Sequence, residues 1–213
     1  MNLPISQSAS QSMSQTIRDQ RRDRILQVAR EVFFEEGFTA ATMSTIAARL
    51  GGSKATLYAY FKNKEDLFDA IIADQCSVLE KMLMLEEEGA DIRTTLIDLG
   101  RELVTAMSSD QAVRTMQLII EESRRNPELA RRFDQAGPQV GTERLGAYLA
   151  KAHARGEICV PDPLHAAGVL TILLKGELHF RRILGLEPEP TPERIEKEVD
   201  SAVTNFLAAY ARK

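Results

Sequence analysis

The sequence predicts an all-α protein of about nine or ten helices, on the evidence of its periodicity, its helix-start signals and its composition. Apolar residues recur every three or four positions along most of the chain, whereas the period-two alternation of half-buried strands is absent at any useful length. Asn126-Pro127, Asp162-Pro163 and Thr191-Pro192 each join a capping residue to a proline, which is typical of a helix start. Of the 213 residues 44% are apolar, so the helices can bury a sizeable core.

The start of the chain predicts a disordered arm followed by one helix. Residues 1–17 are uncharged and rich in Ser and Gln, which leaves too little apolar surface to offset the entropy of ordering. An apolar stripe with helical spacing then predicts a first helix that ends at Gly37. The stripe consists of Ile25, Val28, Ala29, Val32 and Phe33.

Three further helices are predicted at short intervals. Thr42 is placed to cap a short second helix, which Gly51-Gly52 end. Ser53 can cap a third helix, and Asn63, followed by two acidic residues in the first turn, can cap a long fourth one. The rest of the chain then reads as five or six helices, the last two over about residues 163–184 and 192–211.

The second and third helices have the spacing of a helix-turn-helix, which assigns residues 18–64 to a three-helix DNA-binding domain. Ile46, Leu50 and Leu57 are expected to form its small core, and Gly51 allows the tight turn. The outer face of the third helix suits a major groove, because methyl groups meet thymine methyls and an ammonium meets guanine acceptors. That face carries Lys54, Ala55, Thr56, Tyr58 and Ala59.

The charge of the chain is unevenly distributed. The formal net charge is −4, yet residues 18–64 carry nine Lys or Arg against five Asp or Glu. Between Glu36 and Glu65 there are four cationic residues and no carboxylate. A cationic module joined to an acidic remainder indicates a nucleic-acid partner, here double-stranded DNA.

The segment "TMSTIAARLGGSKATLYAYFKNKEDLFDAI" resembles the DNA-binding region of the TetR family of transcriptional regulators, over about residues 22–70. The resemblance implies base or groove contacts from Ser44, Lys54, Ala55, Thr56 and Tyr58, and phosphate contacts from Thr42, Tyr60 and Lys64. Tyr60 can alternatively be a half-buried packing aromatic and Lys64 a surface charge. Gly52 departs from the family, which usually places an apolar residue there. Arg18, Arg21 and Arg22 either follow the DNA backbone or form a solvated charge run.

The resemblance further implies that residues 65–213 form a helical effector-binding and dimerisation domain, and that the protein is a homodimer. Residues 164–184 are apolar on more than one side, too much for a helix that faces only its own core. The alternative is a hydrophobic helix buried entirely within one chain. The predicted dimer contacts are Leu170, Leu174, Leu178, Val199, Val203, Phe206 and Tyr210.

A second stretch, "IIEESRRNPELARRFDQAGP", resembles the C-terminal domain of the AefR-like branch of the TetR family. The resemblance implies a repressor that responds to a small-molecule effector of unknown identity, with its pocket among the fourth to seventh helices. An ordinary hydrophobic core is the competing interpretation for every candidate wall residue. The candidates are Phe68, Ile72, Cys76, Leu79, Met82, Leu83, Met116, Ile120 and Tyr148.

Other classes of protein find little support in the sequence. No apolar run is long enough to span a bilayer and no signal-peptide pattern begins the chain, so a cytoplasmic location is expected. The two cysteines and three histidines are too dispersed for a metal site, and no cofactor is predicted. The sequence contains none of the common catalytic motifs, which argues against an enzyme. The prediction is a ligand-responsive repressor that binds a palindromic operator as a dimer, and the alternative is a helical binding module without sequence-specific DNA binding.

Overall fold

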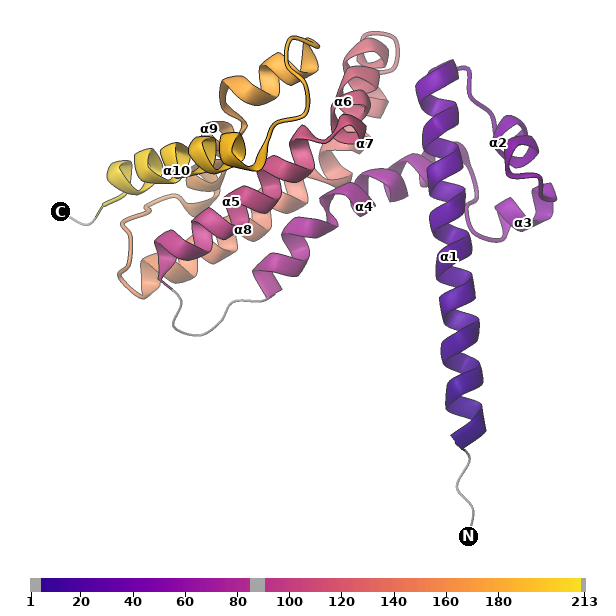
Figure 1. Ribbon diagram of the computed structural model, residues 1–213, viewed down its shortest axis with the longest axis horizontal. Helices are drawn as coiled ribbons and strands as arrows, with labels where there is room; N and C mark the ends of the chain where they lie inside the picture. Colours follow the sequence, from indigo (N-terminus) through magenta and orange to yellow (C-terminus); the bar gives the residue numbers. More distant parts are fainter. Residues whose placement is uncertain (1–4, 85–90, 212–213) are drawn as a thin grey trace. The chain divides into compact units, whose positions relative to one another are not determined.

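The computed structural model describes residues 5–84 and 91–211, with side chains described for residues 16–75 and 91–211 (Figure 1). All regular secondary structure in these ranges is helical, which confirms the predicted all-α class. The helices are α1 (Ile5–Glu36), α2 (Met43–Leu50), α3 (Lys54–Tyr58), α4 (Lys64–Met84), α5 (Ile92–Ser108), α6 (Asp110–Ser123), α7 (Pro127–Ala136), α8 (Pro138–Ala154), α9 (Pro163–Ile183) and α10 (Pro192–Ala209).

The chain divides into two compact units, Met1–Ile71 and Ile72–Lys213, which we call the head and the body. The division falls inside α4, whereas the sequence analysis places the domain boundary between residues 64 and 65. The first turns of α4 belong to the head because Leu67, Phe68 and Ile71 are buried there. The ring of Phe68 lies 6.4 Å from that of Phe33 and 5.3 Å from that of Phe38, between centroids.

The beginning of α1 differs from the sequence expectation. Residues 1–17 are expected to form a disordered arm, but α1 already begins at Ile5, so residues 5–17 are helical in the structure. Residues 5–17 contain neither Gly nor Pro. Ser and Gln lower the stability of a helix far less than Gly or Pro does. The arm therefore extends α1 toward the N-terminus.

The body is built around α9, which packs against α8, α5 and α10. Gly100 of α5 lies where this packing is closest: a Cβ atom at this position would lie 2.8 Å from Val199 Cγ1 and 2.9 Å from Leu174 Cδ2. Only glycine therefore lets α5 approach α9 and α10 at this distance. The prolines at the starts of α7, α9 and α10 confirm the three predicted helix starts.

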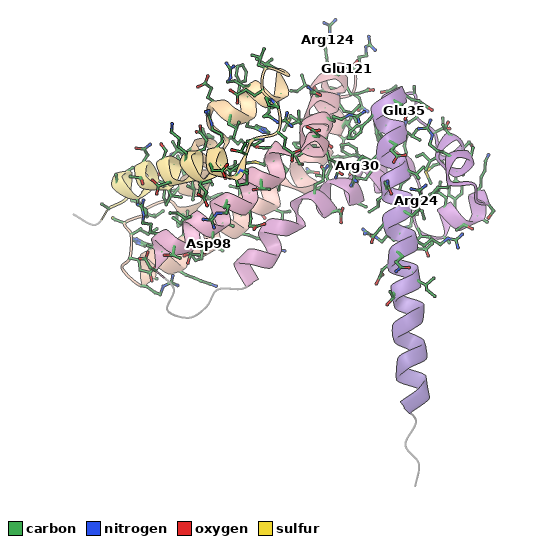
Figure 2. The ribbon with its side chains drawn as sticks, in the orientation of Figure 1. Arg24, Arg30, Glu35, Asp98, Glu121 and Arg124 are labelled. Atoms are coloured by element: carbon green, nitrogen blue, oxygen red, sulfur yellow. The ribbon has the colours of Figure 1, made fainter. Side chains whose placement is uncertain are left out.

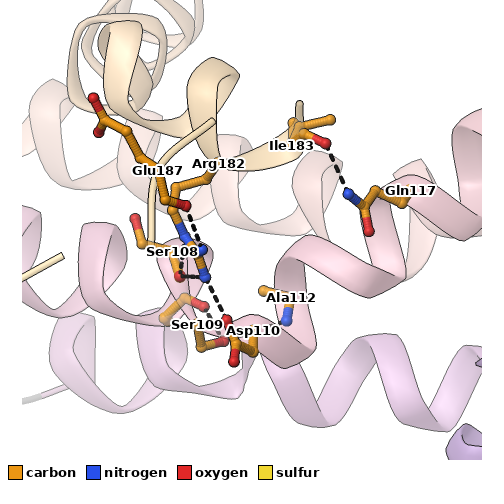
Figure 3. A network of polar contacts seen from close by, with 9 residues as sticks. Ser108, Ser109, Asp110, Ala112, Gln117, Arg182, Ile183 and Glu187 are labelled. Carbon is orange, nitrogen blue, oxygen red and sulfur yellow. Dashed lines mark hydrogen bonds and ion pairs between the residues drawn. The ribbon is translucent and has the colours of Figure 1, made fainter. Parts of the chain in front are cut away.

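A buried guanidinium joins three segments at one end of the body (Figure 3). Arg182 of α9 is only 6% exposed. Its Nε and Nη2 donate to the Ser108 carbonyl at 3.1 and 3.0 Å, its Nη1 to the Glu187 carbonyl at 2.9 Å, and its Nη2 also to Asp110 Oδ1 at 2.6 Å. Nearby, Gln117 of α6 donates to the Ile183 carbonyl at 2.8 Å. One side chain, Arg182, thus holds together the end of α9, the α5–α6 junction and the segment after α9.

We expect Arg182→Met to lower the free energy of unfolding by about 2–4 kcal/mol, because it leaves two carbonyl groups in this buried region without their donors. Asp110→Asn is the matched control: the Asp110 carboxylate is largely exposed, so its loss is expected to cost less than about 1 kcal/mol. Urea unfolding of the full chain measures both values. Equal losses in the two variants would show that the exposed ion pair, and not the carbonyl contacts, supplies the stability.

Candidate nucleic-acid interface

The α2–turn–α3 unit is closed by local capping interactions. Thr42 Oγ1 accepts from the Thr45 N–H at 3.1 Å and begins α2, and Gly51 ends it in the left-handed conformation at φ 66°. Ser53 Oγ then accepts from the Thr56 N–H at 3.2 Å and begins α3. The caps at Thr42 and Ser53 confirm the predicted starts of these two helices, so the turn is set by the residues that the sequence places in it.

One face of this unit is buried in the head and the other is exposed. Ile46, Ala47 and Leu57 are buried as predicted, whereas Leu50 is only half-buried. Arg49 of α2 pairs with Glu35 near the end of α1, which Figure 2 labels. The ion pair of Arg49 with Glu35 joins α2 to the end of α1 within the head.

The residues expected to contact bases lie mostly on the exposed face of the unit. Ser44 is exposed on α2, and Lys54, Ala55 and Tyr58 are exposed on α3, with Tyr58 at 51%. Thr56 differs, because it is half-buried and its hydroxyl lies 3.1 Å from that of Ser53. The structure therefore presents four of these five side chains outward and engages the fifth in the α3 cap.

The residues expected to contact phosphates have three different environments. Thr42 is exposed, although its hydroxyl lies 2.9 Å from that of Thr45. Tyr60 is half-buried, which agrees with the packing alternative as well as with a contact through its hydroxyl. Lys64 is engaged within the head, and the sequence analysis did not anticipate this role.

The ammonium group of Lys64 is used inside the head. Its Nζ donates to the carbonyl oxygens of Phe38, Thr39 and Ala41 at 2.8, 3.0 and 3.1 Å, and it lies 4.7 Å from the centroid of the Phe38 ring. A lysine has three N–H donors, so these carbonyls occupy all of them. The structure thus replaces the predicted phosphate contact of Lys64 with a structural role: it holds the α1–α2 connection against the start of α4.

We expect Lys64→Ala to destabilise the head by about 2 kcal/mol, because three carbonyl groups of the connection lose a charged donor. Amide hydrogen exchange over α1, α2 and α3 of the full chain measures this opening free energy. Lys62→Ala is the control, because it removes the same charge from an exposed position two residues earlier. It is expected to change the opening free energy by less than about 0.5 kcal/mol. Equal protection in the two variants would contradict the structural role of Lys64.

The predicted dimer contacts require a correction. Leu170, Leu174 and Leu178 of α9 face the interior of the body, as do the three predicted apolar positions of α10. Tyr210, which follows α10, packs on Phe206 with ring centroids 4.8 Å apart. The apolar side chains that α9 exposes lie elsewhere, and the sequence analysis missed them. They are Leu164, Ile172 and Phe180, with Leu184 at the C-cap.

The candidate effector residues whose side chains are described have different environments. Phe68 belongs to the aromatic core of the head, Tyr148 is buried in the body core, and Ile120 is 56% exposed on α6. Ile72 is buried and Met116 half-buried. The remaining candidates lie in the part of α4 whose side chains are not described: Cys76, Leu79, Met82 and Leu83.

One small groove in the described part of the body has a volume of about 200 Å³ and lies beside α5 and the start of α10. Its walls include Arg101, Thr105 and Ile195, and none of the predicted effector residues. This volume is below the range of about 300–1,000 Å³ that is typical of ligand pockets. The groove therefore does not by itself define an effector site.

His179 of α9 carries a buried ring nitrogen, Nδ1, without a hydrogen-bond partner in the described part of the body. Burial lowers the pKa of this imidazole, and the nearby positive charge of Lys175 lowers it further. The ring is therefore neutral at neutral pH. Among the described residues, no group of three or more His, Cys, Asp or Glu is arranged to hold a metal ion, and no helix is long and apolar enough to cross a bilayer.

A head that exposes a short helix, held by a capped turn against its partner and followed by a separate helical body, defines a helix-turn-helix regulator of transcription. Residues 25–71 match the family described as bacterial regulatory proteins of the tetR family, and residues 94–212 match the C-terminal domain of AefR-like transcriptional repressors. The chain belongs to the TetR family of transcriptional regulators. The prediction that it is a regulator and not an enzyme agrees with these matches.

Curated relatives and solved structures are of the same class. The chain is 33% identical over 152 residues to the HTH-type transcriptional regulator UidR of Escherichia coli K12, an alignment that covers 70% of this chain and 74% of the relative. The solved structure of the flavonoid-responsive regulator FrrA is 35% identical and has a TM-score of 0.74, covering 92% of this chain and all of that one. A TetR-family regulator from Mesorhizobium loti is 26% identical with a TM-score of 0.76, covering 90% and 97% of the two chains.

Proposed function

We propose that this protein is a repressor that binds a near-palindromic DNA operator as a homodimer and is released by a small-molecule effector. The observation that carries the proposal is the exposed face of α3, where Lys54, Ala55 and Tyr58 project from a helix whose opposite side is buried. A cation, a methyl group and a phenol are side chains that read base edges and phosphates. Repression is favoured because the matched C-terminal domain is described as that of a repressor.

A dimer gives this recognition its symmetry. Two heads related by a two-fold axis read two half-sites about one helical turn, roughly 34 Å, apart. We place the dimer contact on the exposed apolar side of α9, where Ile172 is 70% and Phe180 62% exposed. Large apolar side chains at such exposure are costly to leave in water, and a second copy of the same helix covers them.

We expect Ile172→Asp to weaken dimerisation at least about tenfold, because the two-fold axis would bury two carboxylates in one apolar interface. The substitution should leave the monomer folded, since the side chain makes little contact within its own chain. Ile120→Asp is the matched control, because Ile120 is also exposed but lies on α6. Sedimentation equilibrium measures the dissociation constant, and equal dimerisation of both variants would move the interface away from this side of α9.

The effector would act through the body on the distance between the two heads. The fourth helix, α4, begins in the head and ends in the body, so a shift of α4 on ligand binding changes how the recognition helices are spaced. To reverse a 1:99 population of two states, the effector must differ in affinity for them by about 5.5 kcal/mol. The likeness to the flavonoid-responsive regulator makes planar polyphenols the first class to screen.

Selection from random duplex DNA by the purified full-length protein tests the proposal. We expect an inverted repeat to be enriched, with one dimer bound per site and affinity falling steeply as salt is raised. Tyr58→Ala, which removes an exposed side chain of α3, should change preference at a few base pairs only. If the folded dimer enriches no duplex, the protein is instead a helical binding module without sequence-specific DNA binding.

A further inference from the structure

Three arginines continue the buried stripe of α1 beyond the core of the head. The three are Arg18, Arg21 and Arg22. Each lies seven residues, or about two helical turns, before one buried residue of the stripe, namely Ile25, Val28 and Ala29 respectively. Those three apolar residues are buried against the rest of the head. Since residues seven positions apart share one side of a helix, the arginines lie on the side of α1 that faces the other helices of the head.

The structure places this arginine stripe, defined as Arg18, Arg21 and Arg22, beside the end of α3. The guanidinium of Arg22 lies 6.0 Å from the centroid of the Phe61 ring, and Phe61 is buried just after α3. This cation–π contact joins the stripe to the segment that directly follows α3. Arg21, the preceding residue, and Arg18, about one turn further toward the N-terminus, are exposed, as is Lys62 beside Phe61.

The acidic residues of the same segment are helix neighbours of Arg22 but not of Arg18 or Arg21, because only Asp19 and Arg22 are three positions apart. Asp19 and Asp23 are one turn from each other and share a flank of α1 next to the stripe. Arg18 and Arg21 pair with no carboxylate among the side chains that the structure describes. The positive charge of the stripe is therefore available to a partner outside the chain.

We propose that Arg18 and Arg21 contact DNA phosphates outside the base pairs that α3 reads, with Arg22 as the residue that positions them. The proposal rests on the proposed function, since it requires that α3 binds duplex DNA. It also adds cationic contacts to those of the exposed Lys54 and Lys62, whereas the carbonyls of the α1–α2 connection occupy the Lys64 ammonium. Guanidinium groups suit this role because they stay charged and form paired hydrogen bonds with phosphate oxygens.

The contact lengthens the DNA site without adding sequence information. Phosphate contacts set affinity and register, whereas base contacts set preference. We therefore expect the double variant Arg18→Gln/Arg21→Gln to bind all duplexes more weakly and to keep the same preferred sequence. Each lost phosphate contact lowers the slope of log affinity against log salt by about 0.9, so a dimer that loses two contacts per subunit should lose about 2–4 units of slope.

The experiment compares the wild-type protein and the double variant on two duplexes, one limited to the selected operator and one extended by about half a helical turn on each side. On the longer duplex, wild-type protein is expected to show a higher affinity and a steeper dependence of log affinity on log salt. The variant is expected to show neither increase. The double variant Arg124→Gln/Arg125→Gln removes the same charge from exposed positions of the body and is expected to behave as wild type (Figure 2). Thermal unfolding should not distinguish the head variant from wild type, because Arg18 and Arg21 are exposed.

The outcomes separate this inference from the function on which it rests. If wild-type protein selects and binds an operator but the head variant shows the same affinity, slope and gain with duplex length, the arginine stripe does not contact DNA. If the head variant changes its preferred sequence, the stripe reads bases and the phosphate assignment is wrong. If wild-type protein selects no duplex at all, the proposed function itself fails, and the stripe has no DNA to contact.

Discussion

The geometry of the head depends on one ammonium group. Lys64 lies at the start of α4, and its ammonium donates to three carbonyl oxygens of the α1–α2 connection, those of Phe38, Thr39 and Ala41. These carbonyls follow the end of α1, where no further helical turn supplies N–H donors to them. A charged donor in this place fixes the start of α2 relative to α4, and the aromatic cluster of Phe33, Phe38 and Phe68 fills the space behind it. The exposed face of α3 is thus oriented by a residue that is itself turned inward.

The head and the body stabilise their helices by different means. In the head, short helices rely on caps and on one aromatic cluster, because α3 has only five residues and cannot bury much apolar surface alone. In the body, long helices pack closely, and Gly100 allows α5 to meet α9 and α10 at a distance at which a Cβ atom would force Val199 or Leu174 to shift. The first unit presents a small recognition surface on a fixed frame, whereas the second contains most of the buried apolar side chains that the structure describes.

Local chemistry made much of this structure predictable from the sequence. Thr42, Ser53 and Gly37 were assigned correctly because caps and left-handed ends depend on residues within one turn. The role of Lys64 was not predictable, because its partners lie 23 to 26 positions earlier in the chain. The interior side of α9 was assigned wrongly for a related reason: a helix that is apolar on several sides gives no periodic signal for the side that meets its neighbours. Four of the effector candidates lie where side chains are not described, and they stay predictions.

The buried guanidinium of Arg182 also limits how the body can deform. Its four hydrogen bonds join the end of α9 to the α5–α6 junction and to the segment after α9, so these parts share their degrees of freedom and move as one block. To bend this end of the body, a force must first separate the buried Arg182 guanidinium from the Ser108 and Glu187 carbonyls. The parts of the body that deform most easily therefore lie outside this block. We expect a displacement that begins elsewhere in the body to leave the hydrogen bonds around Arg182 intact.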